Sequence, residues 1–388
     1  MTEQITEETV AVSLEEDNCS RCSICSSLCP FEAIKRDTET GKLLLEIEKC
    51  QVCGICASAC PSKVIDIYYY DIASLVSYLE RAKKEFASDT LLIMCKGSAP
   101  DLNGIESLFG IKKFVPLSVP CVGRIPEEVF IRALVMGIRK IYVLACDEDF
   151  CRFERGSPLE GRRIAALNIL LEQLGYGKEA ITLKRKSLKV LLKEDRCIAC
   201  GNCVYYCPWD APKLVSPGNV KIDMDLCHGC GLCVSMCPAF ALDLENWEKD
   251  RISMLISQLA AEMAPPKILV FCCQWAVFPG LDDEPNKNTR YIYLPCAARV
   301  DIAHVVEAFH TGIDGVLVAA CSEEDCKLEG AGGKIQRPLA ALQERLGEIG
   351  YGEKLHFCTV APRYPEAFKR ELAQFSEKIA GSQKGESS

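Results

Sequence analysis

One cysteine pattern occurs four times in this chain and constrains its fold more than any other feature. The pattern is Cys-x₂-Cys-x₂-Cys-x₃-Cys-Pro, and its four copies begin at Cys19, Cys50, Cys197 and Cys227. Three cysteines spaced in this way can turn their thiolates toward one centre, whereas the fourth, next to a helix-breaking proline, points away. We therefore expect tight cysteine-lined loops that associate in pairs.

The spacing is that of bacterial ferredoxins, in which the fourth cysteine of each copy ligates the neighbouring [4Fe–4S] cluster. The expected ligand sets are Cys19, Cys22, Cys25 with Cys60; Cys50, Cys53, Cys56 with Cys29; Cys197, Cys200, Cys203 with Cys237; and Cys227, Cys230, Cys233 with Cys207. Zinc sites normally join two Cys-x₂-Cys pairs through a longer spacer, so the spacing disfavours zinc. The sequence thus predicts two dicluster modules with four [4Fe–4S] clusters.

Composition narrows the class of protein further. A disulfide scaffold could account for 26 cysteines in 388 residues, but the acidic first 18 residues lack the basic and apolar regions of a signal peptide. No apolar run is long enough to cross a bilayer. We expect a cytoplasmic protein with no direct membrane span. A formal net charge of −9 makes nucleic acid an unsuitable partner and favours redox proteins with basic faces.

The two halves of the chain repeat one another. Cys95, Cys121, Cys146 and Cys151 recur in the same order as Cys272, Cys296, Cys321 and Cys326. This alignment pairs Cys95 with Cys272, and Lys96 with Cys273. Each repeat consists of a dicluster module, a connecting helix with apolar residues at helical spacing, and a larger second module.

Short apolar runs alternate with amphipathic stretches in the second module of each repeat, which is typical of a parallel sheet with crossover helices. The predicted strands are Thr90–Met94, Phe114–Val119, Lys140–Ala145, Lys267–Phe271, Arg290–Leu294 and Gly315–Ala319, and the predicted helices are Glu127–Gly137, Arg162–Leu174, Asp301–His310 and Arg337–Gly347.

The expected architecture is α+β ferredoxin-like dicluster modules that alternate with α/β parallel-sheet modules of Rossmann or flavodoxin type, in an internal two-fold repeat. We expect dicluster modules at residues 10–70 and 188–248, and α/β modules at residues 71–187 and 249–380.

Three cysteines of each α/β module directly follow predicted strands. The carboxyl ends of parallel strands share one edge of the sheet, so these cysteines should converge, and Cys151 and Cys326 can complete two sets of four. Four thiolates suit a [2Fe–2S] cluster or a zinc ion, and ordinary buried cysteines are the third interpretation. The candidate metal ligands are Cys95, Cys121, Cys146, Cys151, Cys272, Cys296, Cys321 and Cys326.

These elements resemble the delta subunit of methyl-viologen-reducing hydrogenases. The resemblance rests on Pro-Cys-x-x-Arg at 120–124 and 295–299, on Ala-Cys-x₄-Cys at 145–151 and 320–326, and on Phe-Cys-Cys-Gln-Trp at 271–275. It implies a [2Fe–2S] cluster in each α/β module. It also implies electron transfer between a hydrogenase or formate dehydrogenase and a heterodisulfide-reductase-like flavoprotein. A further cysteine usual in the family is Ala276 here, and either Cys272 or Cys273 could be the ligand.

The sequence therefore predicts an electron-transfer subunit with four [4Fe–4S] and two [2Fe–2S] clusters rather than a stand-alone catalyst, and no catalytic residue is assigned. Two alternatives stay open: a thiol/disulfide redox enzyme that uses the strand-end cysteines and Cys273, and a docking scaffold with zinc in its α/β modules. The sequence has no nucleotide-binding motif, because the glycines at 330–333 lack the spacing of a phosphate loop.

Overall fold

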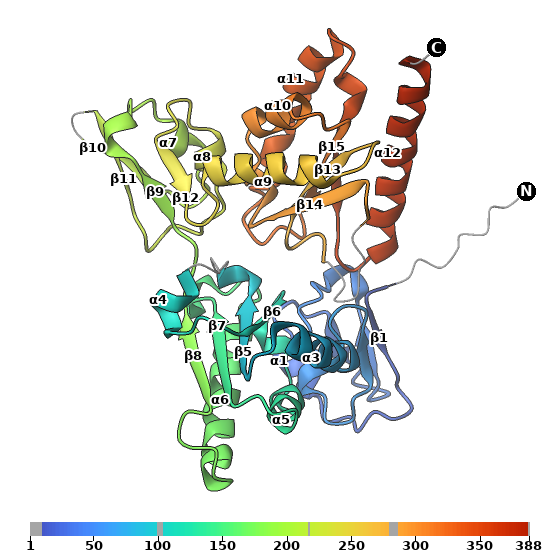
Figure 1. Ribbon diagram of the computed structural model, residues 1–388. Coiled ribbons are helices and arrows are strands. Elements are labelled where there is room, and N and C mark those ends of the chain that lie inside the picture. The colour runs from blue at the N-terminus through green and yellow to red at the C-terminus, as the bar shows by residue number, and fades with distance from the viewer. Residues whose placement is uncertain (1–9, 99–103, 216–217, 279–285, 387–388) are drawn as a thin grey trace, which may run out of the picture. The chain divides into compact units, whose positions relative to one another are not determined.

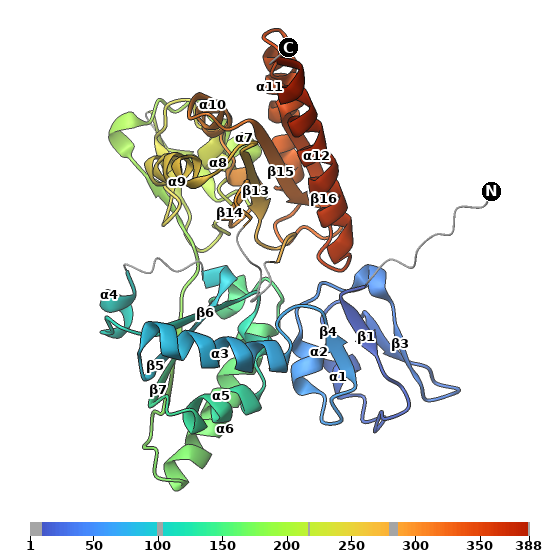
Figure 2. The same cartoon turned by 45° about the vertical axis from the view of Figure 1, so that its right-hand side comes forward.

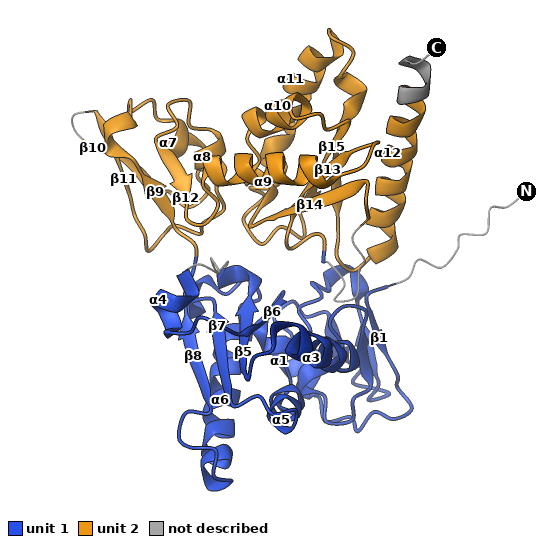
Figure 3. Ribbon diagram, viewed as in Figure 1, with its two compact units in different colours: residues 1–187, 278–283 blue, residues 188–277, 284–388 orange. Residues whose placement is uncertain are grey.

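The computed structural model describes residues 10–98, 104–215, 218–278 and 286–386. The chain divides into two compact units, one of Met1–Ser187 with Phe278–Asp283 and one of Leu188–Val277 with Glu284–Ser388 (Figure 3). We describe each unit separately and call them unit 1 and unit 2.

Unit 1 begins with a cysteine-rich part built from very short elements. Strand β1 (Val12–Leu14) pairs antiparallel with β4 (Ile65–Ile67), β2 (Ile34–Arg36) pairs antiparallel with β3 (Leu43–Leu45), and the helices are α1 (Ile24–Leu28) and α2 (Ile55–Ala59) (Figure 1). Each helix starts inside a cysteine copy and ends at its fourth cysteine, Cys29 or Cys60, which precedes a proline. The proline cannot continue the helix, so the chain turns away at that point.

Helix α3 (Ile72–Phe86) leads from this part to a four-stranded parallel sheet. The strands are β5 (Thr90–Cys95), β6 (Val115–Val119), β7 (Lys140–Ala145) and β8 (Ile181–Arg185), in the order β6-β5-β7-β8. The other helices are α4 (Ile105–Phe109), α5 (Glu127–Val135) and α6 (Gly156–Gln173). The order changes direction between β5 and β7, which is where ligands bind in open parallel sheets.

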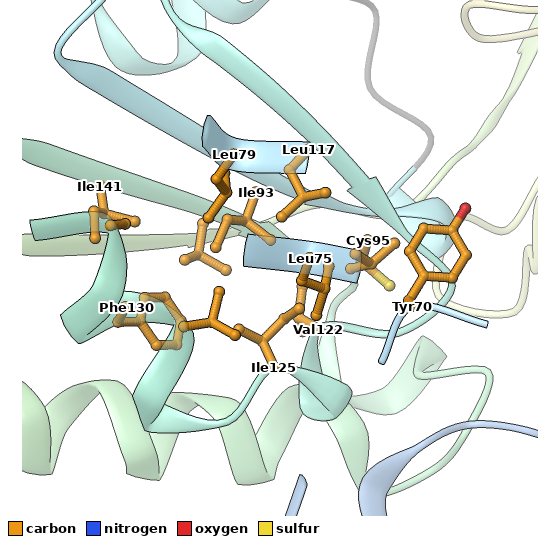
Figure 4. Packing of buried hydrophobic residues seen from close by; sticks show 14 of the residues in the cluster. Tyr70, Leu75, Leu79, Ile93, Cys95, Leu117, Val122, Ile125, Phe130 and Ile141 are labelled. Carbon is orange, nitrogen blue, oxygen red and sulfur yellow. The ribbon is translucent and has the colours of Figure 1, made fainter. Parts of the chain in front are cut away.

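Alternate residues along the strands of unit 1 face two different layers of helices. Helices α3, α5 and α6 pack on one face, where Leu79 and Phe130 meet Ile93 and Leu117 (Figure 4). Helix α4 packs with Leu92 and the other residues of the opposite face.

Unit 2 has the same kinds of elements in the same order. Its cysteine-rich part contains β9 (Val190–Leu192) paired with β12 (Leu242–Leu244), β10 (Pro212–Val215) paired with β11 (Asn219–Ile222), and helices α7 (Asn202–Tyr206) and α8 (Leu232–Ser235). Its parallel sheet contains β13 (Ile268–Cys273), β14 (Thr289–Leu294), β15 (Gly315–Cys321) and β16 (Leu355–Val360), in the order β14-β13-β15-β16.

Helices α9 (Lys249–Glu262), α10 (Ile302–His310) and α11 (Gln336–Gly347) cover one face of this second sheet. The long α12 (Pro365–Glu386) lies alongside β15 and β16 (Figure 2). There, Phe375 and Ile379 approach Gly315 so closely that a side chain at that position would clash with them.

The six strands predicted from the apolar runs are confirmed, with ends that differ by at most two residues. Helix α6 begins at Gly156 rather than at Arg162, because Pro158 lies in the first turn, where a missing N–H costs no helical hydrogen bond. The edge strands β8 and β16 and the helix α12 were not among the predicted elements.

Candidate metal centres

The structure brings the cysteines of the four-fold pattern together in sets of four, each with three cysteines from one copy and one from another. Cys19, Cys22, Cys25 and Cys60 line a hollow of about 280 Å³; Cys29, Cys50, Cys53 and Cys56 line one of about 380 Å³; Cys197, Cys200, Cys203 and Cys237 line one of about 340 Å³. The remaining walls are largely aliphatic. These hollows therefore combine soft thiol donors with exclusion of water.

The fourth set contains Cys207, Cys227, Cys230 and Cys233. Burial raises the pKa of the Cys233 thiol well above its ordinary value, and nearby Cys230, Cys227 and Cys207 raise it further. In unit 1, burial likewise raises the pKa of Cys53 to about 12. Thiols so crowded resist ionisation unless a cation balances their charge, which metal ions do when they bind thiolates.

Left-handed residues shape the loops between the cysteines. Each copy has two residues with positive φ between its first and third cysteines: Arg21 and Ser23, Val52 and Gly54, Ala199 and Gly201, Gly229 and Gly231. A chain that alternates between right- and left-handed conformations forms a concave nest of N–H groups that favours anions. The same turns direct three thiols inward.

The two sets of each unit differ in exposure. Cys22 and Cys200 are exposed, whereas Cys53 and Cys230 are buried. We call the sets that contain Cys22 and Cys200 the outer sets, and those that contain Cys53 and Cys230 the inner sets.

The strand-end cysteines of unit 1 converge at the carboxyl edge of its sheet. Cys95 ends β5 and Cys146 follows β7, and their Sγ atoms are 3.9 Å apart at the point where the strand order reverses. Cys151 Sγ accepts a hydrogen bond from the Ser157 amide at 3.4 Å, in the first turn of α6. Cys121 follows β6, and a Cβ atom added to Gly156 would lie 2.1 Å from its Sγ.

Hydrogen bonds among these thiols divide the protons unequally. Cys146 has a pKa well above its ordinary value because it is the donor to Cys151 and Cys95. The hydrogen bond from Cys146 lowers the pKa of Cys151 to about 6, and amides at the start of α6 lower it further. The set therefore readily supplies thiolates, the form that binds metal.

Unit 2 repeats this arrangement around Cys273. The thiol of Cys321 donates to Cys273 Sγ at 3.3 Å. Although burial alone would raise it, the pKa of Cys273 lies well below its ordinary value because the thiols of Cys296 and Cys321 donate to it. Cys272 Sγ instead donates to the Ile292 carbonyl at 3.9 Å.

The strand register corrects the alignment of Cys95 with Cys272. Cys95 lies opposite Val119 in β6, two residues before Cys121, and Cys273 lies opposite Leu294 in β14, two residues before Cys296. Cys273 is therefore the counterpart of Cys95. Because neighbouring strand residues point to opposite faces, a shift of one residue places Cys272 on the other side of the sheet.

In each unit the inner set lies next to the strand-end cysteines. Cys53 is close enough to Cys121 to raise its pKa further, after burial and the nearer thiols. In unit 2, Cys230 and Cys296 pack in the same buried cluster. Ser58 of α2 and Ser235 of α8 donate to the carbonyls of Gly123 and Ala298, which fastens each inner loop to the turn after the second strand of its sheet.

Within the described residues, the side chains of His, Cys, Asp and Glu form no group of three or more around the position of a single metal ion. No helix among those residues is both long and apolar enough to cross a membrane.

Paired sets of four cysteines and a cysteine-lined sheet edge define an iron–sulfur protein. Models of the 4Fe-4S dicluster domain match residues 11–61 and 190–244. The chain belongs to the family described as methyl-viologen-reducing hydrogenase, delta subunit, whose model matches residues 93–191 and 268–381, more than half of the chain.

Curated relatives include two kinds of protein. One belongs to the ferredoxin:CoB-CoM heterodisulfide reductase of Methanosarcina mazei; the chain is 30% identical to it over 224 residues, which covers 55% of this chain and 28% of that protein. The other is the iron-sulfur subunit of the F420-non-reducing hydrogenase vhc of Methanococcus voltae, with 32% identity over 96 residues, which covers 23% of this chain and 67% of that protein. The chain thus matches little more than a quarter of the first relative.

Glu160 makes the stability of unit 1 depend on pH. Burial raises its pKa from 4.5 to about 8, although Arg163 Nη1 lies 3.4 Å from its carboxylate. The folded state therefore holds a proton that the unfolded state has lost above pH 4.5. Between about pH 4.5 and 8 the free energy of unfolding should fall as pH rises, by at most about 1.4 kcal/mol per pH unit.

Urea unfolding of the wild type and Glu160→Gln at pH 6 and pH 8 measures this dependence. We expect the slope to be shallower in the variant, whose amide does not titrate. Equal slopes would mean that Glu160 is ionised in the folded protein.

Gly156 should be indispensable to the strand-end site of unit 1. A methyl group there would overlap Cys121 Sγ and displace the start of α6, at a cost of about 1–3 kcal/mol. We expect Gly156→Ala to reduce the iron bound per chain after anaerobic reconstitution. Gly332→Ala is the matched control in unit 2, because its Cβ would lie 3.8 Å from Cys296 Sγ, an ordinary contact. Full iron content in both variants would contradict the expected clash.

Proposed function

We propose that this protein is an iron–sulfur electron-transfer subunit of the hydrogenase or heterodisulfide reductase type, which connects larger catalytic subunits. The observation that carries the proposal is the succession of three cysteine sets in each unit. An outer set has a cysteine at the surface, the inner set is buried beside the sheet, and the strand-end set lies at the sheet edge.

The outer and inner sets are proposed to hold four [4Fe–4S] clusters. Their spacing, the crossed contribution of the fourth cysteine and the matches to the dicluster domain support this assignment. Two strand-end sets are proposed to hold [2Fe–2S] clusters: Cys95, Cys121, Cys146 and Cys151 in unit 1, and Cys273, Cys296, Cys321 and Cys326 in unit 2. Cys273 replaces Cys272 in this assignment because it occupies the register position of Cys95.

Bound clusters would supply reversible one-electron redox chemistry. The protein's own contribution is to exclude water and to control access. Aliphatic walls protect the inner sets, and the exposed edges at Cys22 and Cys200 leave one side of each outer set accessible to a partner. The same edges would allow electrons to enter or leave.

The chain is proposed to be a tandem duplication, with dicluster modules at 10–70 and 188–248 and α/β modules at 71–187 and 249–380. The matching sheet orders of the two units support this history. The proposed partners are a hydrogenase or formate dehydrogenase and a heterodisulfide-reductase-like flavoprotein, in the cytoplasm. The names of the relatives support the hydrogenase and heterodisulfide reductase assignments.

Iron and acid-labile sulfide per chain, with EPR of the reduced protein, test the proposed clusters. Anaerobically purified protein should contain about 20 iron atoms if all six sites are filled, and about 16 if only the dicluster modules are loaded. A value near 16 without a [2Fe–2S] signal would overturn the strand-end assignment and favour zinc or no metal there.

Neighbouring cysteines in unit 2 provide a matched pair of variants. Cys273→Ser should remove the [2Fe–2S] signal of unit 2, because it replaces the sulfur that lies beside Cys321 and accepts hydrogen bonds from two thiols. Cys272→Ser changes an equally buried residue on the opposite face and should leave that signal intact. The reverse result would make Cys272 the ligand.

A further inference from the structure

Each unit buries one arginine at the junction between its inner set and its strand-end set. Arg124 is 3% exposed and Arg299 is fully buried. Both end a short 3₁₀ turn that starts directly after a strand-end cysteine, Cys121 or Cys296. A guanidinium is always charged, so its burial is strongly unfavourable unless other groups compensate the charge.

Protein groups satisfy only part of the hydrogen-bonding capacity of these arginines. Arg124 Nη2 donates to the Tyr69 carbonyl at 2.8 Å, and Arg299 Nε donates to the Trp247 carbonyl at 3.0 Å. Among the described residues, Nε and Nη1 of Arg124 and both terminal nitrogens of Arg299 have no hydrogen-bond partner, although all are buried. Such groups normally mark a ligand that completes the site.

The arginines pack directly against the loops of the inner sets. A Cβ atom added to Gly54, between Cys53 and Cys56, would lie 2.9 Å from Arg124 Nε and 3.1 Å from Nη2. In unit 2, a Cβ atom on Gly231 would lie 2.8 Å from Arg299 Cδ. At the equivalent position of an outer set, Gly201, the nearest atom would be Leu214 Cδ1 at 3.9 Å. The close approach of an arginine thus distinguishes the inner sets.

Thiols from both sets surround the charge in unit 1. The sulfurs of Cys121, Cys53 and Cys56 all interact electrostatically with the Arg124 guanidinium, together with Tyr70, whose ring centroid is 5.2 Å from Cζ. In unit 2, Cys233 of the inner set interacts with Arg299, as do Asp301 and Asp243. Cys121 and Cys296 begin the same turns and fix the other side of each junction.

We propose that Arg124 and Arg299 set the redox potentials of the two clusters on either side of them. The proposal rests on the proposed function and names residues beyond the cysteine ligands. Their unpaired N–H groups donate to the inner and strand-end clusters, and their fixed positive charge stabilises an added electron at this junction. Charge and hydrogen bonds near cluster sulfur raise the reduction potential.

Potentiometric titration monitored by EPR tests this proposal in the full reconstituted chain. Arg124→Gln keeps an amide donor but removes the charge. It should move the midpoint potentials of one [4Fe–4S] and one [2Fe–2S] cluster to more negative values while the iron content stays that of the wild type. Arg132→Gln is the control, because this arginine is exposed on α5 and should leave every potential unchanged.

Unchanged potentials in Arg124→Gln with intact clusters would overturn the proposal and leave the arginine a structural role only. If this variant lost its clusters, Arg299→Gln would decide the question independently in unit 2, and Arg124→Lys, which keeps the charge, would be expected to regain them. Failure of Arg124→Lys to load clusters, with no shift in Arg299→Gln, would also overturn it. Failure of the proposed function is distinguishable, because it would show as a missing [2Fe–2S] signal in the wild type.

Discussion

The crossed use of the fourth cysteine is the constraint on which the rest of each unit depends. Neither copy of the pattern can complete its own set, so two copies must fold together, as Cys60 does with the first copy and Cys29 with the second. The strands of these parts are only three or four residues long and bury few apolar side chains. Parts this small usually need metal for stability, and thiols crowded in apolar hollows need a cation to ionise.

Parallel strands solve a different problem at the sheet edge. A set of four built from one short loop needs tight left-handed turns, whereas the strand-end set gathers residues that are far apart in sequence. The sheet aligns the ends of β5, β6 and β7, and the start of α6 adds amide donors to Cys151. Reversal of strand order at β5 and β7 opens the space in which the two strand-end sulfurs meet.

Spacing and apolar runs predicted much of this arrangement from the sequence, because both are local. They gave the six strands, the connecting helices and the convergence of cysteines at the strand ends. They could not separate Cys272 from Cys273, since adjacent cysteines in one strand look alike until the register assigns each a face. The buried arginines were part of a recognised element, but their environment comes from Gly54 and Gly231, which lie far from them in sequence.

Inner and outer copies share one cysteine spacing, so the difference between them must arise from what each contacts. Glycine at the second left-handed position is required twice in the inner copies, once for positive φ and once because an arginine occupies the space of a side chain. The first outer copy tolerates Ser23 there, with its hydroxyl near Arg36 at the surface. A duplicated ligand pattern can thus provide two different environments: one open to a partner, and one enclosed by a buried charge that favours the added electron.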